Sequence, residues 1–367
     1  MSSDVSTQEE SNQPVAPAAA PATQLAEQSL GQRLLHGDIG QLPAILMLAL
    51  IVIIFQIISG GFFLKPVNIS NLILQEASTA LVALGAVMTL LLAEIDLSLA
   101  AVATLCGSVM VVLSVYQHWN APTAILAGVI VGAIIGALNG VLVAVMRVPS
   151  FVVTLAAYLF YFGVNEHILL PQTTVRVIDP GITDIMTGYV TFPYDVLSPL
   201  PIIALYAWAL IAERNHRIKL GLQVGPAWTM WGRIVAVLVI AVVGLLIFES
   251  ALGVPYALYI VVGVIIVLWL ALRFTIYGRH IYAVGGSPEA ARRAGIRVTA
   301  IRISVFAIGS ALAGLGGVLE SSRTISAGAQ VDPQLLLLAI AVAVIGGVSL
   351  FGGRGSVWGV VLGILII

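Results

Sequence analysis

Two carboxylates stand between long apolar stretches, in the run Ala93-Glu94-Ile95-Asp96-Leu97-Ser98. An ionisable side chain at membrane depth is costly and usually marks a functional site, such as a proton or substrate pathway. The same two carboxylates could instead belong to a short loop at the membrane surface. Glu76, early in the preceding apolar stretch, has the same two interpretations.

The run Tyr277–Ile296 has the signals of a short, capped helix. Ser287 is a good N-cap and is followed by proline, which suits the first helical position. Glu289 falls at the positive end of the helix and Arg292 at the negative end, and Gly295 is placed as a C-terminal stop. Such a helix could dock in a groove of a partner protein. The alternative is a basic loop that touches anionic lipid headgroups.

Two further segments combine helix breakers with side chains that could bind a ligand. In Arg147–Leu155 a proline interrupts the chain, Ser150 can cap the next helix, and Phe151 could offer a flat face to a sugar. Such aromatic residues more often pack or sit at the membrane interface. The glycine-rich run Gly346–Ser356 predicts a tight re-entry of the chain, with a flexible loop as the alternative. It lacks the Lys-Ser/Thr ending of a phosphate-binding loop.

The elements that position these residues must lie in a membrane. Only 9% of the 367 residues are charged, 60% are hydrophobic and the net charge is −1. This composition excludes a soluble protein and a nucleic-acid binder. The single Cys106 excludes a disulfide framework, the five histidines are scattered, and no residues have the spacing of a metal site or a nucleotide-binding motif.

We therefore expect an all-α polytopic membrane protein with about ten transmembrane helices. A span needs about 20 mostly apolar residues. The windows are 43–60, 71–93, 97–116, 122–146, 150–170, 196–212, 232–249, 254–274, 301–319 and 333–350. A last run, Ser356–Ile367, reaches only about 18 Å as a helix and is expected to be a half-helix or part of a truncated span.

The basic residues orient these spans. With a cytoplasmic N-terminus, 13 of the 16 Lys and Arg residues fall on the cytoplasmic side, as the positive-inside rule expects. Residues 1–42 form the expected cytoplasmic tail, whose Pro- and Ala-rich composition predicts disorder. Residues 43–367 form the expected transmembrane domain, with the capped loop at 275–300. Gly128, Gly132, Gly136 and Gly140 recur every four residues, which favours close helix packing over a glycine-lined conduction path.

These motifs resemble those of monosaccharide ABC importer permeases, the ribose/galactose/xylose group. The resemblance covers about residue 43 to the end and rests on five spaced motifs. They are the Ile95-Asp96-Leu97-Ser98 run, Asn139-Gly140, Pro149-Ser150-Phe151 with Thr154-Leu155, the Gly346–Ser356 run, and the pattern formed by Gly278, Tyr282, Ala283, Gly285, Gly286, Glu289, Ala290, Ala291, Arg292, Gly295 and Ile296.

Within that group the chain is most similar to the xylose-type branch. Ala93-Glu94 before the first motif resembles this branch, as does the extra basic loop and span from Arg217 to Phe248. Leu99-Ala100 stands where the family usually has Val-Gly. Relatives continue beyond the position of Ile367, so we expect a truncated product or fragment.

The resemblance implies a transport subunit without enzymatic activity, located in the bacterial inner membrane. It implies a pore of two permease copies, two cytoplasmic ATPase subunits that bind all the ATP, and a periplasmic or lipid-anchored sugar-binding protein. No cofactor is expected in this chain, and D-xylose is the expected cargo. The residues expected to couple to the ATPase are Ser287, Glu289, Ala290, Ala291, Arg292 and Gly295. Those expected along the substrate pathway are Glu94, Asp96, Ser98, Asn139, Phe151 and Thr154.

Two other functions remain open from the residues alone. An ion-coupled secondary transporter could use Glu94, Asp96 or Glu76 as proton sites. The sequence shows no clear internal repeat of the kind that many secondary transporters have, which counts against it. A structural or regulatory membrane subunit without a transport path is the third possibility.

Overall fold

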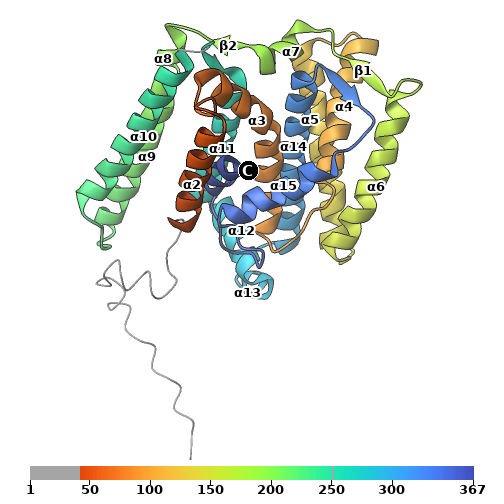
Figure 1. The fold of residues 1–367 in the computed structure, drawn as a ribbon. Coiled ribbons are helices and arrows are strands. Elements are labelled where there is room, and N and C mark those ends of the chain that lie inside the picture. Colours follow the sequence, from red (N-terminus) through yellow and green to blue (C-terminus); the bar gives the residue numbers. More distant parts are fainter. Residues whose placement is uncertain (1–41, 250–251) are drawn as a thin grey trace, which may run out of the picture. The chain divides into compact units, whose positions relative to one another are not determined.

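The computed structural model describes residues 42–249 and 252–367, whose arrangement is shown in Figure 1. The expected tail, 1–42, therefore lies outside the described residues except for Leu42. The expected all-α architecture is confirmed, because within the described ranges nearly all regular structure is helical.

Within the described residues, eight helices are long and apolar enough to cross a membrane, and they match eight of the ten expected windows. Seven of them are α3 (Pro66–Leu90), α4 (Leu99–Tyr116), α5 (Ala121–Ala144), α6 (Ser150–Leu169), α10 (Ala227–Glu249), α11 (Tyr256–Phe274) and α14 (Val298–Arg323). The eighth joins the one-turn α8 (Tyr194–Leu197) to α9 (Pro199–Lys219).

The other two windows form shorter helices than expected. Helix α2 (Leu42–Ile58) has 17 residues and α15 (Pro333–Ile345) has 13. At 1.5 Å per residue α15 is about 20 Å long, which is less than the ~30 Å hydrocarbon core. It ends early because the backbone turns at Gly347, whose φ is +86°. The eight-residue α16 (Gly359–Ile366) follows this turn.

Helix α14 lies at the centre of the packing, against α3, α4 and α5. The glycine stripe of α5 faces it, so the packing interpretation of that stripe is confirmed. A Cβ at Gly136 would overlap the Phe306 carbonyl, and one at Gly132 would come within 2.7 Å of the Ser310 carbonyl oxygen. The small residues therefore allow the backbones of α5 and α14 to approach closely.

Short elements lie at both ends of the long helices (Figure 1). At one end β1 (Thr174–Arg176) pairs with β4 (Ser326–Gly328), and β2 (Tyr189–Val190) pairs with β3 (Val254–Pro255), both antiparallel. Helix α7 (Pro180–Thr187) lies at the same end. At the other end are α12 (Ile276–Gly286) and α13 (Pro288–Arg293).

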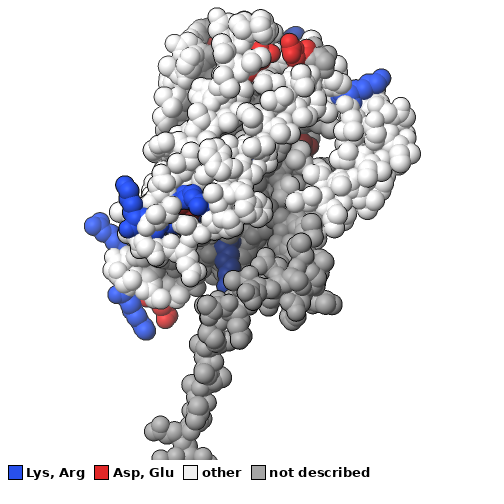
Figure 2. Space-filling view, turned by 90° about the vertical axis from the view of Figure 1, so that its left-hand side faces the viewer, with Lys and Arg blue, Asp and Glu red and all other residues white. Residues whose placement is uncertain are grey.

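Helices α9 and α10 pack against each other and leave most of their apolar side chains exposed. Figure 2 shows the face that carries them. Basic side chains gather mainly at its lower end and acidic ones mainly at its upper end, with a nearly uncharged band between them. An uncharged band between charged ends is the surface that a bilayer requires.

Candidate functional site

The loop between α3 and α4 carries a buried carboxyl group. Asp96 is 2% exposed. Its Oδ1 accepts hydrogen bonds from the backbone N–H of Ser98 at 2.9 Å and from the Ser98 hydroxyl at 2.6 Å. Because these bonds fold the loop back just before α4 begins, Asp96 fixes the entry into that helix.

A chain of hydrogen bonds extends from this loop across two further helices. Asn139 of α5 donates from Nδ2 to the Ser98 hydroxyl oxygen at 3.2 Å. Tyr161 of α6 donates its hydroxyl proton to Asn139 Oδ1, also at 3.2 Å. All four side chains are buried. Three of the residues expected along the pathway, Asp96, Ser98 and Asn139, are thus brought together.

Thr154, a fourth expected residue, fastens the same loop to the first turns of α6. The Leu97 backbone N–H donates to Thr154 Oγ1 at 3.0 Å, and the Thr154 hydroxyl is 2.8 Å from the Ser150 carbonyl oxygen. The Ile95 N–H donates to the Ser150 hydroxyl at 3.3 Å. The loop therefore cannot move without α6 or without breaking these bonds.

The second carboxylate oxygen of Asp96, Oδ2, has no hydrogen-bond partner among the described residues. A buried charge without a full set of partners is costly. Burial accordingly raises the pKa of Asp96 above its usual value, and the bonds from Ser98 offset only part of that rise. Chemically, this leaves one oxygen free to bind a proton or a hydroxyl group. The described part of the chain has no group of three side chains able to hold a metal ion.

The remaining two expected pathway residues lie outside this chain of bonds. Glu94 forms an ion pair with Arg302 of α14, with Nη2 and Oε1 3.2 Å apart. Phe151 is 56% exposed on α6. The arrangement makes Glu94 a tie between the loop and α14, and it leaves Phe151 away from the buried hydrogen bonds.

Two residues that take part in this site, Tyr161 and Arg302, were not among the six residues expected along the pathway. Tyr161 lies seven residues after Thr154, which places both on one face of α6. Arg302 lies one turn into α14, where it contacts Glu94 in the loop between α3 and α4. Spacing could have suggested the first, but only the packing of distant segments reveals the second.

The expected capped helix is present as α13. Ser287 accepts a hydrogen bond from the Ala290 N–H at 3.3 Å, and Gly295 has φ +83° after the helix. Of the expected coupling residues, Ala291 is 3% exposed and packs into the core. The others are exposed: Ser287, Glu289, Ala290, Arg292 and Gly295. The helix is therefore held by one apolar anchor and presents its charged side chains outward.

The glycine-rich run Gly346–Ser356 contacts both the end of α12 and the loop 91–98 between α3 and α4, which we call the Asp96 loop. The Gly353 N–H donates to the Leu91 carbonyl at 2.9 Å, and the Tyr282 hydroxyl donates to the Gly355 carbonyl at 3.0 Å. A Cβ at Gly285 would overlap the Leu91 carbonyl oxygen. These close contacts favour the tight re-entry over a flexible loop, and they connect α12 directly to the loop that carries Asp96.

Comparison with known proteins identifies the class of this molecule. Residues 68–367 match the family described as branched-chain amino acid transport system / permease component. The chain belongs to this family. It is 35% identical to the xylose transport system permease protein of Haemophilus influenzae, over 88% of this chain and 86% of that protein. No solved structure gives a significant match.

Two further relatives agree with this assignment. The xylose transport system permease protein of Escherichia coli K12 is 34% identical over 86% of this chain and 80% of the relative. The ribose import permease protein of Bacillus subtilis is 30% identical over 92% of this chain and 86% of the relative. The chain is therefore a permease subunit of an ABC importer, a multi-pass inner-membrane protein that works with separate ATPase and substrate-binding partners.

Proposed function

We propose that this chain forms the membrane pathway of an ATP-driven importer for a monosaccharide, D-xylose, as a homodimer. The relatives named for xylose and ribose support a sugar as cargo. The resemblance to monosaccharide importer permeases supports two copies and a periplasmic or lipid-anchored sugar-binding protein. ATP is bound by the ATPase subunits, and this chain needs no cofactor.

The observation that carries the proposal is the direct contact between α12, the helix immediately before α13, and the Asp96 loop. Helix α13 presents Glu289 and Arg292 on an exposed, capped turn, which is a suitable shape for a partner's groove. Helix α12, immediately before it, touches the Leu91 carbonyl through Gly285. A movement of α13 driven by the ATPase would therefore reach the loop at once.

The hydrogen bonds of that loop extend the movement into the bundle. Ser98, Asn139 and Tyr161 link the loop to α5 and α6. We propose that Asp96, Ser98, Asn139 and Thr154 border the sugar pathway, where hydroxyl, amide and carboxyl groups can exchange hydrogen bonds with sugar hydroxyls. Glu94 holds the loop on α14 through Arg302, and Phe151 belongs to the exposed surface of α6 rather than to this group.

A charge reversal on α13 tests the coupling role. Glu289→Lys should reduce both ATPase co-purification and xylose uptake by about tenfold, because the like charge opposes the helix dipole and changes the docking surface. The matched control is Glu166→Lys, the same reversal on an exposed residue near the end of α6. Co-purification should be unchanged in that control.

Two outcomes would count against the proposal. Equal co-purification and uptake in both variants would remove the coupling role of α13. Uptake of a different sugar in preference to xylose, measured with the sugar-binding protein present, would overturn the assigned cargo but not the coupling role.

A further inference from the structure

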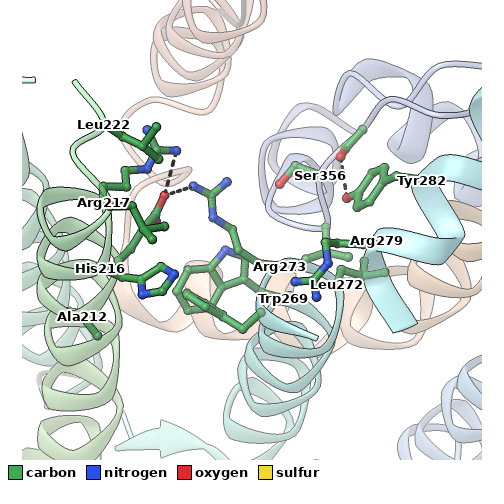
Figure 3. A pocket seen from close by; sticks show the side chains of 15 residues that line it. Ala212, His216, Arg217, Leu222, Trp269, Leu272, Arg273, Arg279, Tyr282 and Ser356 are labelled. Carbon is green, nitrogen blue, oxygen red and sulfur yellow. Dashed lines mark hydrogen bonds and ion pairs between the residues drawn. The ribbon is translucent and has the colours of Figure 1, made fainter. Parts of the chain in front are cut away.

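A cavity of about 1030 Å³ lies between α9, α11, α12 and the residues that precede α16. Figure 3 shows it from close by. It is lined by Arg217 of α9, Arg273 of α11 and Arg279 of α12. It lies at the end of the molecule that carries α13, which the distribution of basic residues assigns to the cytoplasmic side.

The cavity has an excess of positive charge. Three arginines line it together with His216, against one carboxylate, Glu213. That carboxylate is already shared, because Arg273 approaches it to 2.7 Å and Arg217 to 3.3 Å. Figure 3 shows both contacts as dashed lines: the Arg273 contact joins α11 to α9, and the Arg217 contact lies within α9. Arg279 has no ion pair within the described ranges, so its guanidinium is available to a ligand.

The walls of the same cavity are apolar. Leu220, Leu222 and Leu272 line it beside the Trp269 indole. Trp269 also belongs to an aromatic cluster, with its ring centroid 5.7 Å from that of Tyr206 and 6.3 Å from that of Trp358. Indole and phenol rings gather at the level of lipid headgroups, where one edge is apolar and the other is wet.

We propose that this cavity binds an anionic phospholipid, with its phosphodiester held by Arg217, Arg273 and Arg279 and its acyl chains against the leucine and indole wall. Guanidinium groups suit phosphate oxygens because their N–H groups can donate in pairs. Basic pockets between membrane helices on the cytoplasmic side are suited to such headgroups. Helix α9 exposes Leu205 and Trp208, which provides an apolar approach from the bilayer.

An acidic surface of the ATPase would match the same charges, but it would not match the walls. A peptide carboxylate gains nothing from the leucines and indole ring in the lining, whereas an acyl chain buries them. The combination of arginine side chains and an apolar wall in one cavity therefore favours a lipid.

A lipid in this position would connect α9 to α12, the helix that leads into α13. Arg279 and Tyr282 both belong to α12, and Tyr282 is bonded to the glycine-rich run through the Gly355 carbonyl. The bound phosphate would add contacts that hold α12 beside α9. We therefore expect anionic lipid to increase ATP-driven uptake by this importer.

The test uses the full chain with its ATPase and sugar-binding partners in phosphatidylcholine, with or without phosphatidylglycerol, in nanodiscs for lipid retention and in proteoliposomes for uptake. Native mass spectrometry counts the lipid that stays bound. Arg279→Gln and Arg217→Gln should each lower the retained phosphatidylglycerol at least fivefold and remove the stimulation of uptake. The matched control is Lys219→Gln, which removes one positive charge from the same helix, α9, but lies outside the cavity.

Three results would overturn the proposal. The first is equal lipid retention in Arg279→Gln, Arg217→Gln and Lys219→Gln. The second is full competition by soluble glycerol phosphate, which would show that a free phosphate is the ligand. The third is a loss of ATPase binding by Arg279→Gln in pure phosphatidylcholine, together with unchanged phosphatidylglycerol retention by this variant in the mixed bilayer, which would make the cavity a partner surface.

Discussion

At the scale of single residues, Asp96 is a carboxyl group that the fold buries away from water, although its charged form is more stable in water. Its folded-state pKa is raised above 3.8 by burial. As the pH rises above that value the unfolded chain loses this proton first, so stability falls until the folded state also deprotonates. Asp96→Asn removes this loss. The melting temperature of the variant relative to the natural protein, measured in detergent, should therefore increase as the pH is raised.

The control for this prediction is Asp332→Asn. The exposed Asp332 also accepts a backbone hydrogen bond through Oδ1, from the Gln334 N–H at 2.8 Å. Comparing the two variants separates the loss of such a bond from the effect of burial. A difference in melting temperature that stays constant with pH for Asp96→Asn would show that its burial does not govern stability.

The residues of this site could be predicted only in part. The motif at 95–98 was identifiable from the sequence because carboxylates between apolar stretches need a reason to be there, and Asn139 was identifiable only through the resemblance to sugar importer permeases. Their mutual hydrogen bonds join residues that are 41 positions apart. The pairing of Glu94 with Arg302 spans a still longer stretch. Helical spacing carries no information about such contacts, because they depend on how the helices pack.

At the scale of elements, the decisive contact is between the end of α12 and the turn that follows α3. A methyl group at Gly285 would overlap the Leu91 carbonyl oxygen, so these two backbones must separate in Gly285→Ala. Overpacking of this kind costs about 1–3 kcal/mol. We expect uptake to fall by about tenfold or more while the ATPase still co-purifies, because α13 itself keeps its cap and its anchor.

The neighbouring glycine provides the control. Nothing lies within 4 Å of a Cβ at Gly286, and this residue is exposed. Gly286→Ala should therefore support normal uptake. If the two alanine variants transport equally well, the contact between α12 and the Asp96 loop plays no part in coupling.

Helices could be predicted from the sequence where hydropathy or a capping residue within the segment itself determines them. The capped α13 and eight of the spans follow from such local signals. The length of α15 did not, because a run that is apolar to Leu350 is interrupted by the turn at Gly346 and Gly347. At this turn the backbone of Gly346 lies against that of Gly359, and a Cβ on Gly359 would overlap the Gly346 carbonyl oxygen. A hydropathy window averages over the residues on both sides of this turn, so it does not detect where α15 ends.

At the scale of the whole molecule, the structure connects one charged end to the interior by a short path. Helix α13 leads through α12 to the Asp96 loop, and that loop leads to α5, α6 and α14 by hydrogen bonds and an ion pair. No step in this path requires a proton to cross the bilayer. An importer built in this way should draw its energy from the partner that moves α13.

The energy source is therefore the last prediction. In proteoliposomes that contain this permease with its ATPase and sugar-binding partners, uptake of xylose should stop when ATP is withheld. It should be unchanged when a protonophore collapses the proton gradient, because the buried Asp96 is held within a hydrogen-bonded loop and not within a relay of carboxylates. An ATPase variant that binds but does not hydrolyse ATP is the control for intact assembly. Uptake that survives without ATP and stops with the protonophore would instead identify an ion-coupled transporter, and Asp96 would then be its proton site.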